Sequence, residues 1–142
     1  MEYTFHYLLM ANQAIFHREV LALLKDTKLT LGQPKVLDYL MDHDGAGQKE
    51  IARGCHIEPA SLTVTLNGME EKGLVRREIP KEDRRSSHVF LTPLGREMLQ
   101  KVEEAFLKAE TSALSSLSPQ ERTAFLETFE KIYENLKGDL TR

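Results

Sequence analysis

The chain has 142 residues, 41 % of them apolar and 29 % charged, with 19 basic against 22 acidic side chains and a formal net charge of −3. These are ordinary values for a globular protein with one core, and the single cysteine excludes both a disulfide framework and a thiolate zinc finger. Because the chain contains no run of about 18 apolar residues and begins without a basic and then apolar leader, we expect a cytoplasmic protein.

Two helices are predicted in the first third of the chain. Apolar side chains recur at helical spacing over about residues 3–25. A capping-box pattern, in which Thr30 is followed by Gln33, then predicts the start of a second helix, because each side chain can satisfy a backbone amide there. Gly45 can adopt a positive φ angle and is expected to end the second helix near residue 43.

Two shorter helices follow and are separated by a tight turn. The first is expected over about residues 48–54, with the turn over 54–57. Pro59 suits the first turn of the next helix, where its missing N–H costs nothing, and Gly73 is expected to end that helix after residue 72. Two short helices joined by a turn that contains glycine form a helix-turn-helix.

The segment after the helix-turn-helix has the pattern of a β-hairpin with a charged tip. Residues 74–79 and 88–91 are strand-like, and the link between them, 80–87, is polar and charged. A helix-turn-helix followed by a hairpin with a basic tip is a winged helix. We therefore expect a mainly α fold with a small β wing (α+β).

Two longer helices are predicted after the hairpin. Thr92 precedes a helix expected over about residues 93–115. A second capping box, Ser118 with Glu121, opens a last helix over about 119–137. These two helices and the first one lie outside the winged helix in sequence and carry more apolar surface than so small a core requires.

The apolar surface of the outer helices predicts a partner. Phe125 and Phe129 lie one turn apart on the last helix, and an exposed stripe of that kind normally marks an interface. The partner is either another part of the same chain or, as we favour, a second copy, because two-fold dimers are the commonest oligomers. If each helix-turn-helix binds DNA through its second helix, the recognition helix, two-fold symmetry would place the two recognition helices about one DNA turn apart.

Basic side chains gather in the middle of the chain. They outnumber acidic ones nine to seven in residues 47–96, although both flanking segments are acidic. Between residues 72 and 85 the basic residues are Lys72, Arg76, Arg77, Lys81, Arg84 and Arg85. A local positive potential can attract phosphate even on an acidic protein. The alternative is that these charges form a solvated face.

The order and spacing of several motifs resemble the MarR family of bacterial transcriptional regulators. The stretches that carry the resemblance are Leu29-Thr30-Leu31-Gly32-Gln33, Ile51-Ala52, Ala60-Ser61-Leu62-Thr63-Val64-Thr65, residues 69–77, Asp83-Arg84-Arg85 and Leu91-Thr92-Pro93-Leu94-Gly95. The resemblance implies a single MarR-type domain over 1–142. It also implies a winged helix-turn-helix DNA-binding lobe over 28–95, with N- and C-terminal dimerisation helices in 1–27 and 96–142.

The resemblance also implies which residues meet DNA. The helix over 59–72 would enter the major groove, and the hairpin would place an arginine in the minor groove, where Asp83 can orient Arg85. An exposed ion pair is the alternative role for these two side chains. The candidate DNA-binding residues are Pro59, Ala60, Ser61, Thr63, Thr65, Asn67, Lys72, Arg76, Arg77, Asp83, Arg84 and Arg85.

The recognition helix departs from the family pattern. Relatives often carry basic residues where this chain has Val64 and Gly68, and no Arg or Lys precedes Lys72 in this helix. The commonest specific contact, arginine to guanine, is therefore missing from its middle. We expect readout that leans towards A·T pairs, with phosphates and the hairpin supplying affinity, and the helix N-terminus at Pro59 and Ala60 close to a phosphate.

An effector site is expected between the outer helices and the winged helix. Its candidate residues are His6, Met10, Phe16, His17 and Tyr39, each with packing in the core or the dimer as the alternative. Cys55 is either a redox sensor or, as we favour, a small buried side chain. The histidines lack the i, i+4 spacing of a helical metal site, so we expect no metal and no cofactor.

These features favour one function over a second. We expect a homodimeric, sequence-specific regulator of transcription that binds a pseudo-palindromic operator in double-stranded DNA, acts as a repressor, and is released by a small molecule or an oxidant. No nucleophile–base set or phosphate-binding glycine loop is present, so an enzyme is not expected. The alternative is an adaptor that uses the winged helix only for protein–protein contact, which the net charge of −3 and the lack of a basic residue before Lys72 in the recognition helix favour.

Overall fold

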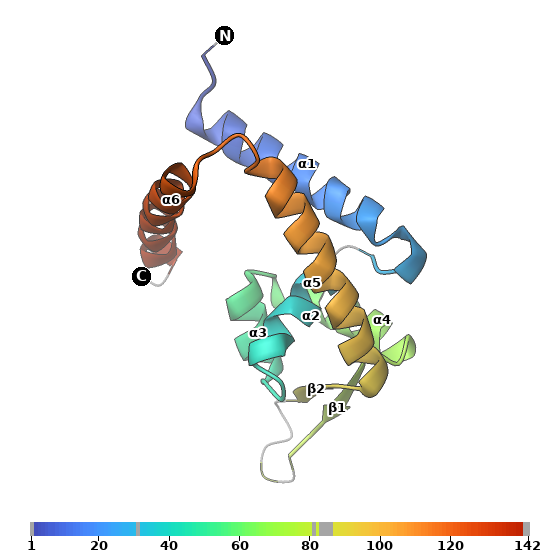
Figure 1. Ribbon diagram of the computed structural model, residues 1–142. Helices are drawn as coiled ribbons and strands as arrows, with labels where there is room; N and C mark the ends of the chain where they lie inside the picture. The colour runs from blue at the N-terminus through green and yellow to red at the C-terminus, as the bar shows by residue number, and fades with distance from the viewer. Residues whose placement is uncertain (1, 31, 81, 83–86, 141–142) are drawn as a thin grey trace. The chain divides into compact units, whose positions relative to one another are not determined.

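The computed structural model describes residues 2–30, 32–80, 82 and 87–140, and it is mostly helical (Figure 1). In chain order the elements are α1 (Phe5–Leu23), the short 3-10 turn η1 (Lys25–Thr27), α2 (Gln33–Asp42), α3 (Gln48–Cys55), α4 (Pro59–Glu71), β1 (Val75–Glu78), β2 (His88–Leu91), α5 (Pro93–Ala113) and α6 (Pro119–Leu140). The two strands form one antiparallel sheet. The predicted fold class is confirmed.

The chain divides into two compact units, Met1–Ala109 and Glu110–Arg142. In the first unit α2, α3, α4 and the hairpin gather around the N-terminal half of α5 (Figure 1). α1 lies beside the later part of α5, where the rings of Phe16 and Phe106 stack with centroids 6.4 Å apart. The second unit contains α6.

The core of the first unit is built from one face of each element. Its fully buried large side chains are Val36, Leu37, Leu40, Ile51, Leu62, Leu66, Met69, Val89 and Val102. Each buried side chain of this size contributes about 1.5–3 kcal/mol. Most of them come from α2, α3 and α4, so apolar burial fixes the orientation of these three helices.

Most helix boundaries follow from local signals. Thr92 Oγ1 accepts a hydrogen bond from Gly95 N at 2.9 Å, which caps α5. Ser118 and Glu121 form a complete capping box, since each side chain accepts from the other's backbone N–H at 3.1 Å. Gly73 ends α4 with a φ of 75°. These three predictions are confirmed.

The start of α2 differs from the prediction. Gln33 Oε1 accepts from Thr30 N at 3.1 Å, as expected. However, Thr30 does not cap the helix, because Gly32 is the N-cap residue, with a φ of 84° and no side-chain cap. Gln33 N donates to the backbone oxygen of Thr30 instead. A turn therefore precedes α2, and only half of the predicted capping box is present.

The hairpin is fastened to the segment that enters α3. Gly45 N donates to Val89 O at 2.8 Å, and Val89 N donates to Ala46 O at 3.0 Å. Gln48 N donates to Ser87 O at 3.0 Å, and His88 pairs with Gly47 in an isolated bridge. The outer edge of β2 is thus occupied by residues 45–48, which holds the base of the hairpin against the helix-turn-helix.

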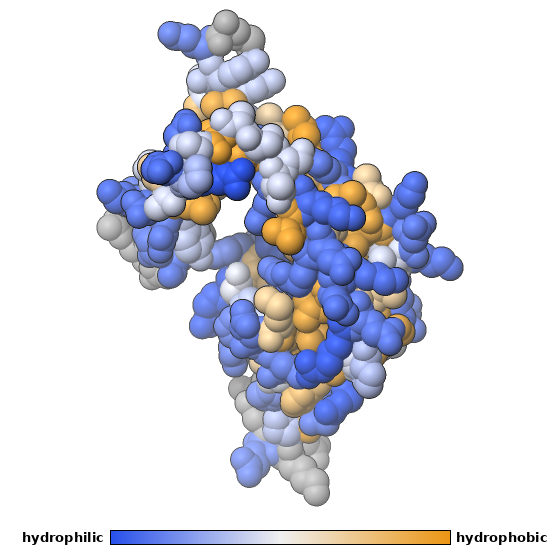
Figure 2. Space-filling view, in the orientation of Figure 1, coloured by the Kyte–Doolittle hydropathy of each residue, from blue (hydrophilic) through white to orange (hydrophobic). Residues whose placement is uncertain are grey.

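Apolar side chains remain exposed on the outer helices. In the orientation of Figure 1, Figure 2 shows apolar surface over α1 and α5. The exposed large apolar side chains of α1 and α6 are Phe5, Tyr7, Leu8, Met10, Ile15, Leu23, Phe125, Leu126, Phe129, Tyr133 and Leu136. In the ranges the structure describes, no helix combines the length and apolar character needed to cross a bilayer.

Candidate nucleic-acid interface

Helix α4 buries one face and leaves the rest for contact. Leu62, Leu66 and Met69 point into the core. The opposite face is centred on Val64, whose side chain is 71 % exposed. The helix was predicted to meet DNA through polar side chains, and Val64 was not among them. Its signal in the sequence is its position half a turn from the buried stripe, and an apolar side chain there can contact a thymine methyl group.

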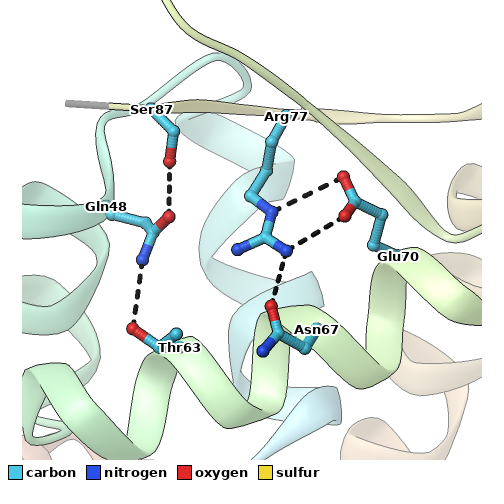
Figure 3. Close-up of polar contacts among 6 residues, drawn as sticks. All are labelled: Gln48, Thr63, Asn67, Glu70, Arg77 and Ser87. Atoms are coloured by element: carbon cyan, nitrogen blue, oxygen red, sulfur yellow. Dashed lines mark hydrogen bonds and ion pairs between the residues drawn. The ribbon is translucent and has the colours of Figure 1, made fainter. Parts of the chain in front are cut away.

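One flank of α4 faces the hairpin, and a single arginine joins the two (Figure 3). Arg77, on β1, donates from one terminal nitrogen to Asn67 Oδ1 at 2.6 Å and to Glu70 Oε1 at 3.0 Å. Its Nε also lies 3.5 Å from Glu70 Oε2. Two residues predicted to meet DNA separately, Asn67 and Arg77, are therefore brought together.

The charge of Arg77 is partly balanced by Glu70. The hydrogen bond from Arg77 lowers the pKa of the Glu70 carboxyl, and the positive charge of the guanidinium acts in the same direction. The Arg77 side chain is only 19 % exposed, whereas that of Glu70 is 45 % exposed. This arginine therefore has less free positive charge for a phosphate than the sequence implied.

A second polar chain links the hairpin to α4 through Gln48 (Figure 3). Ser87 Oγ donates to Gln48 Oε1. Gln48 Nε2 donates to Thr63 Oγ1 at 3.5 Å, and the Thr63 hydroxyl donates to Pro59 O at 3.1 Å. Sequence reasoning missed Gln48, because its partners lie 15 and 39 residues away.

The other flank of α4 faces α2. The Thr65 hydroxyl donates to Ser61 O at 3.0 Å, and a Cβ added at Gly32 would lie 3.3 Å from Thr65 Oγ1. Lys72 Nζ donates to Lys28 O at 2.7 Å and to Gln33 Oε1 at 2.8 Å. All four residues were candidates for DNA contact, but Thr65 and Lys72 lie on the opposite flank of α4 from Thr63 and Asn67.

The N-terminus of α4 is exposed. Pro59, Ala60 and Ser61 are all on the surface, and the N-cap residue, Glu58, makes no side-chain cap. The first-turn amides and the positive end of the helix dipole are thus available to a phosphate.

The two strand arginines point to opposite faces of the hairpin. Arg76 pairs with Phe90 across the sheet and Arg77 with Val89. Because side chains alternate along a strand, Arg77 faces α4 and Arg76 faces away from it. The Arg76 guanidinium lies 4.6 Å from the centroid of the Phe90 ring and forms an ion pair with Glu78. Asp83, Arg84 and Arg85 fall outside the residues the structure describes.

The candidate effector residues have different surroundings. His6 and Met10 are exposed on α1, while Phe16 packs against the core. His17 is half-buried, and its Nε2 has no hydrogen-bond partner among the described residues. Tyr39 stacks on His43 with centroids 4.2 Å apart. Phe16 and Tyr39 thus have packing roles in the core.

Cys55 is buried, and its surroundings do not activate the thiol. The Cys55 side chain is 2 % exposed, its Sγ lies 3.9 Å from Lys35 O, and burial raises the pKa of the thiol to about 11. Such a thiol is poorly ionised and unreactive. Within the described ranges no group of three His, Cys, Asp or Glu side chains has the geometry for a metal ion.

Comparison with known proteins supports the predicted family resemblance. Residues 29–87, which run from the approach to α2 through the first hairpin strand to the residue before the second, match the MarR family model. This match covers less than half of the chain, and it shows that the winged helix-turn-helix is similar to the MarR family. Members of this family are DNA-binding transcriptional regulators without enzymatic activity. The predicted resemblance to MarR-family regulators is confirmed.

Three relatives carry this comparison further. A proposed transcriptional regulatory protein for the hcr operon of Thauera aromatica is 27 % identical over 105 residues, which are 74 % of this chain and 63 % of that protein. The MepR–DNA complex of S. aureus is 25 % identical with a TM-score of 0.86, covering 95 % of this chain and 99 % of MepR. The repressor CouR, bound to a 23-mer DNA duplex, is 27 % identical with a TM-score of 0.82, covering 92 % of each chain.

Proposed function

We propose that this chain is a homodimeric, MarR-family repressor of transcription in the cytoplasm that binds a pseudo-palindromic operator and is released by a small molecule. The observation that carries the proposal is the exposed face of α4, where Ser61, Thr63 and Asn67 stand clear of the core and where Thr63 and Asn67 lie on the flank that faces the hairpin. Its support from relatives is that similar chains, MepR and the repressor CouR, are bound to DNA.

In this proposal each part of the lobe has a different task. Helix α4 enters the major groove, with Thr63, Val64 and Asn67 nearest the base edges. Its N-terminus, at Pro59 and Ala60, lies close to a phosphate. Arg76 acts at the phosphate backbone, and Asp83, Arg84 and Arg85 act at the minor groove. Lys72 and Arg77 are instead held by contacts within the fold. Phosphate contacts fix the register, and base contacts supply the specificity.

The homodimer rests on the exposed apolar side chains of α1 and α6. On α6 the rings of Phe125 and Phe129 stack with centroids 5.1 Å apart, and both rings are exposed. Apolar surface of this kind normally marks an interface. We expect Phe129→Asp to convert the protein from dimer to monomer in light scattering, whereas the polar change Glu130→Gln on the same helix leaves the mass unchanged.

The releasing signal is a small molecule rather than an oxidant acting on a thiol. Cys55 is the chain's single cysteine, and its burial and raised pKa oppose oxidation. The candidates for contact with an effector are His6, Met10 and His17, together with Phe16 and Tyr39 at the edge of the core. A ligand can release DNA only by binding the DNA-free conformation more tightly than the bound one.

The decisive experiment is selection of binding sites from random duplexes, followed by titration between about 50 and 200 mM salt. We expect a two-fold symmetric site and an affinity that falls steeply with salt, because counterions are released from phosphates. Arg85→Ala is expected to weaken operator binding. No selected site, or weak and salt-insensitive binding beside a stable complex with another protein, would instead identify an adaptor.

A further inference from the structure

The orientation of the Asn67 carboxamide is determined by its partner. Arg77 approaches the carboxamide at 2.6 Å through a terminal guanidinium nitrogen. A guanidinium can only donate hydrogen bonds, so the atom that faces it must be the Asn67 oxygen. The Asn67 amide nitrogen, with its two donor hydrogens, is therefore turned away from Arg77 (Figure 3).

Arg77 is itself held in place. Two of its nitrogens face the carboxylate oxygens of Glu70, one turn along α4 from Asn67, at 3.0 and 3.5 Å. Its side chain is four-fifths covered, and its strand position is fixed by pairing with Val89. Charge-assisted hydrogen bonds of this kind are stronger than neutral ones. Reversing the Asn67 carboxamide would therefore place two donors face to face and lose such a bond.

This arrangement opposes the usual reading of adenine by asparagine. That contact needs the side-chain oxygen to accept from adenine N6 while the nitrogen donates to N7. The Asn67 oxygen keeps a second lone pair, but the cationic Arg77 nitrogen 2.6 Å away makes this oxygen a weaker acceptor for a further N–H donor. What Asn67 offers a base edge most readily is its amide donor.

We propose that Asn67 acts as a donor-only reader that selects guanine, with Arg77 as its positioning residue. Guanine presents two adjacent acceptors, N7 and O6, in the major groove, whereas adenine pairs one acceptor with a donor. The positive charge of Arg77 beside the carboxamide favours the same acceptor-rich edge. The inference rests on the proposed docking of α4 in the major groove, and it replaces the expected A·T preference at this one position.

Site selection from random duplexes tests the proposal, with each variant first checked for folding by circular dichroism. Asn67→Ala should remove the preference at one symmetry-related pair of positions, which identifies the base that Asn67 reads. The wild-type protein should prefer guanine over adenine there by roughly 5- to 150-fold. Arg77→Ala frees the Asn67 oxygen and should shift the preference at those same positions towards adenine.

Arg76→Ala is the matched control, because it removes the same charge from the adjacent residue on the opposite face of the hairpin. It should weaken binding without changing the preferred base. If Arg77→Ala does not fold, the Asn67→Ala comparison decides alone. The inference is overturned if the wild-type protein prefers adenine at the position where Asn67→Ala removes the base preference. It is also overturned if Asn67→Ala removes no base preference at all. In either case the protein still binds DNA. Failure of the wild-type protein to select any site overturns the proposed function and this inference together.

Discussion

Lys72, at the C-terminal end of α4, donates a hydrogen bond to Gln33, the first residue of α2, across 2.8 Å from Nζ to Oε1. The same ammonium donates to Lys28 O at 2.7 Å, and Gln33, which is buried, also accepts from Thr30 N. Gly68 leaves room for this junction, because a Cβ there would lie 3.0 Å from Gln33 Nε2. The angle between α4 and α2 is thus fixed by a polar junction as well as by apolar packing.

The first prediction is that Lys72 stabilises the fold more than it binds phosphate. Lys72→Met keeps the aliphatic stem but leaves the buried Gln33 carboxamide without its charged donor, so the free energy of unfolding should fall by about 1–3 kcal/mol in urea titration. Lys108→Met, at an exposed position of α5, is the control and should change stability little. If stability is unchanged and the slope of the logarithm of the DNA-binding constant against the logarithm of salt concentration falls by about one unit, Lys72 serves chiefly as a phosphate contact.

The second prediction concerns the contact between α5 and Leu74, the residue before β1. A Cβ added at Gly95 would lie 2.0 Å from Leu74 O, a backbone atom that cannot rotate away. Gly95→Ala should therefore lower the free energy of unfolding by about 3 kcal/mol. At Gly138, on α6, an added Cβ meets nothing within 4 Å, so Gly138→Ala should be neutral or stabilise by up to about 1 kcal/mol. Equal stability of the two variants would contradict this account.

The third prediction concerns Cys55. Burial raises the pKa of its thiol to about 11, and the thiolate is the reactive form. At pH 8 the native protein should react with iodoacetamide at least about 100-fold more slowly than the urea-unfolded chain. Hydrogen peroxide at concentrations that oxidise free thiols should leave DNA binding unchanged. Rapid labelling of the native protein would restore the redox-sensor interpretation.

The helix ends of this fold are predictable because their causes are local. Ser118 and Glu121 cap α6 over three residues, Thr92 caps α5 over the same distance, and Gly73 ends α4 by a backbone conformation that glycine adopts readily. None of these helix ends depends on contacts with residues that are far away in the sequence. The start of α2 was mispredicted where a longer-range contact intervened, since Gln33 also serves Lys72.

The candidate interface is less predictable because its contacts cross the fold. Gln48 meets Ser87 across 39 residues, and Arg77 reaches Asn67 only once β1 has docked beside α4. Composition identifies the basic segment, but it does not show which charged side chains form hydrogen bonds or ion pairs within the fold. The opposite orientations of Arg76 and Arg77 do follow from strand alternation, so this separation was available in the sequence and was missed when both were assigned to phosphates.

The last prediction is a pH dependence that belongs to Glu70. Because Arg77 lowers the pKa of this carboxyl in the folded protein below its usual 4.5, the unfolded chain binds the proton more tightly. The resulting stabilisation is present above about pH 4.5 and is lost as pH falls through the lower folded value. For an exposed pair it amounts to no more than about 1 kcal/mol.

Urea titrations of the wild-type protein and Glu70→Gln between pH 3 and 7 measure this stabilisation directly. The wild-type protein should be the more stable at pH 7, and the difference should shrink below pH 4.5, since protonation removes the charge that Gln also lacks. Glu71→Gln removes a neighbouring carboxylate of the same helix and controls for the loss of one charge. A difference that grows on acidification would show that the Arg77 contact does not stabilise the ionised form of Glu70.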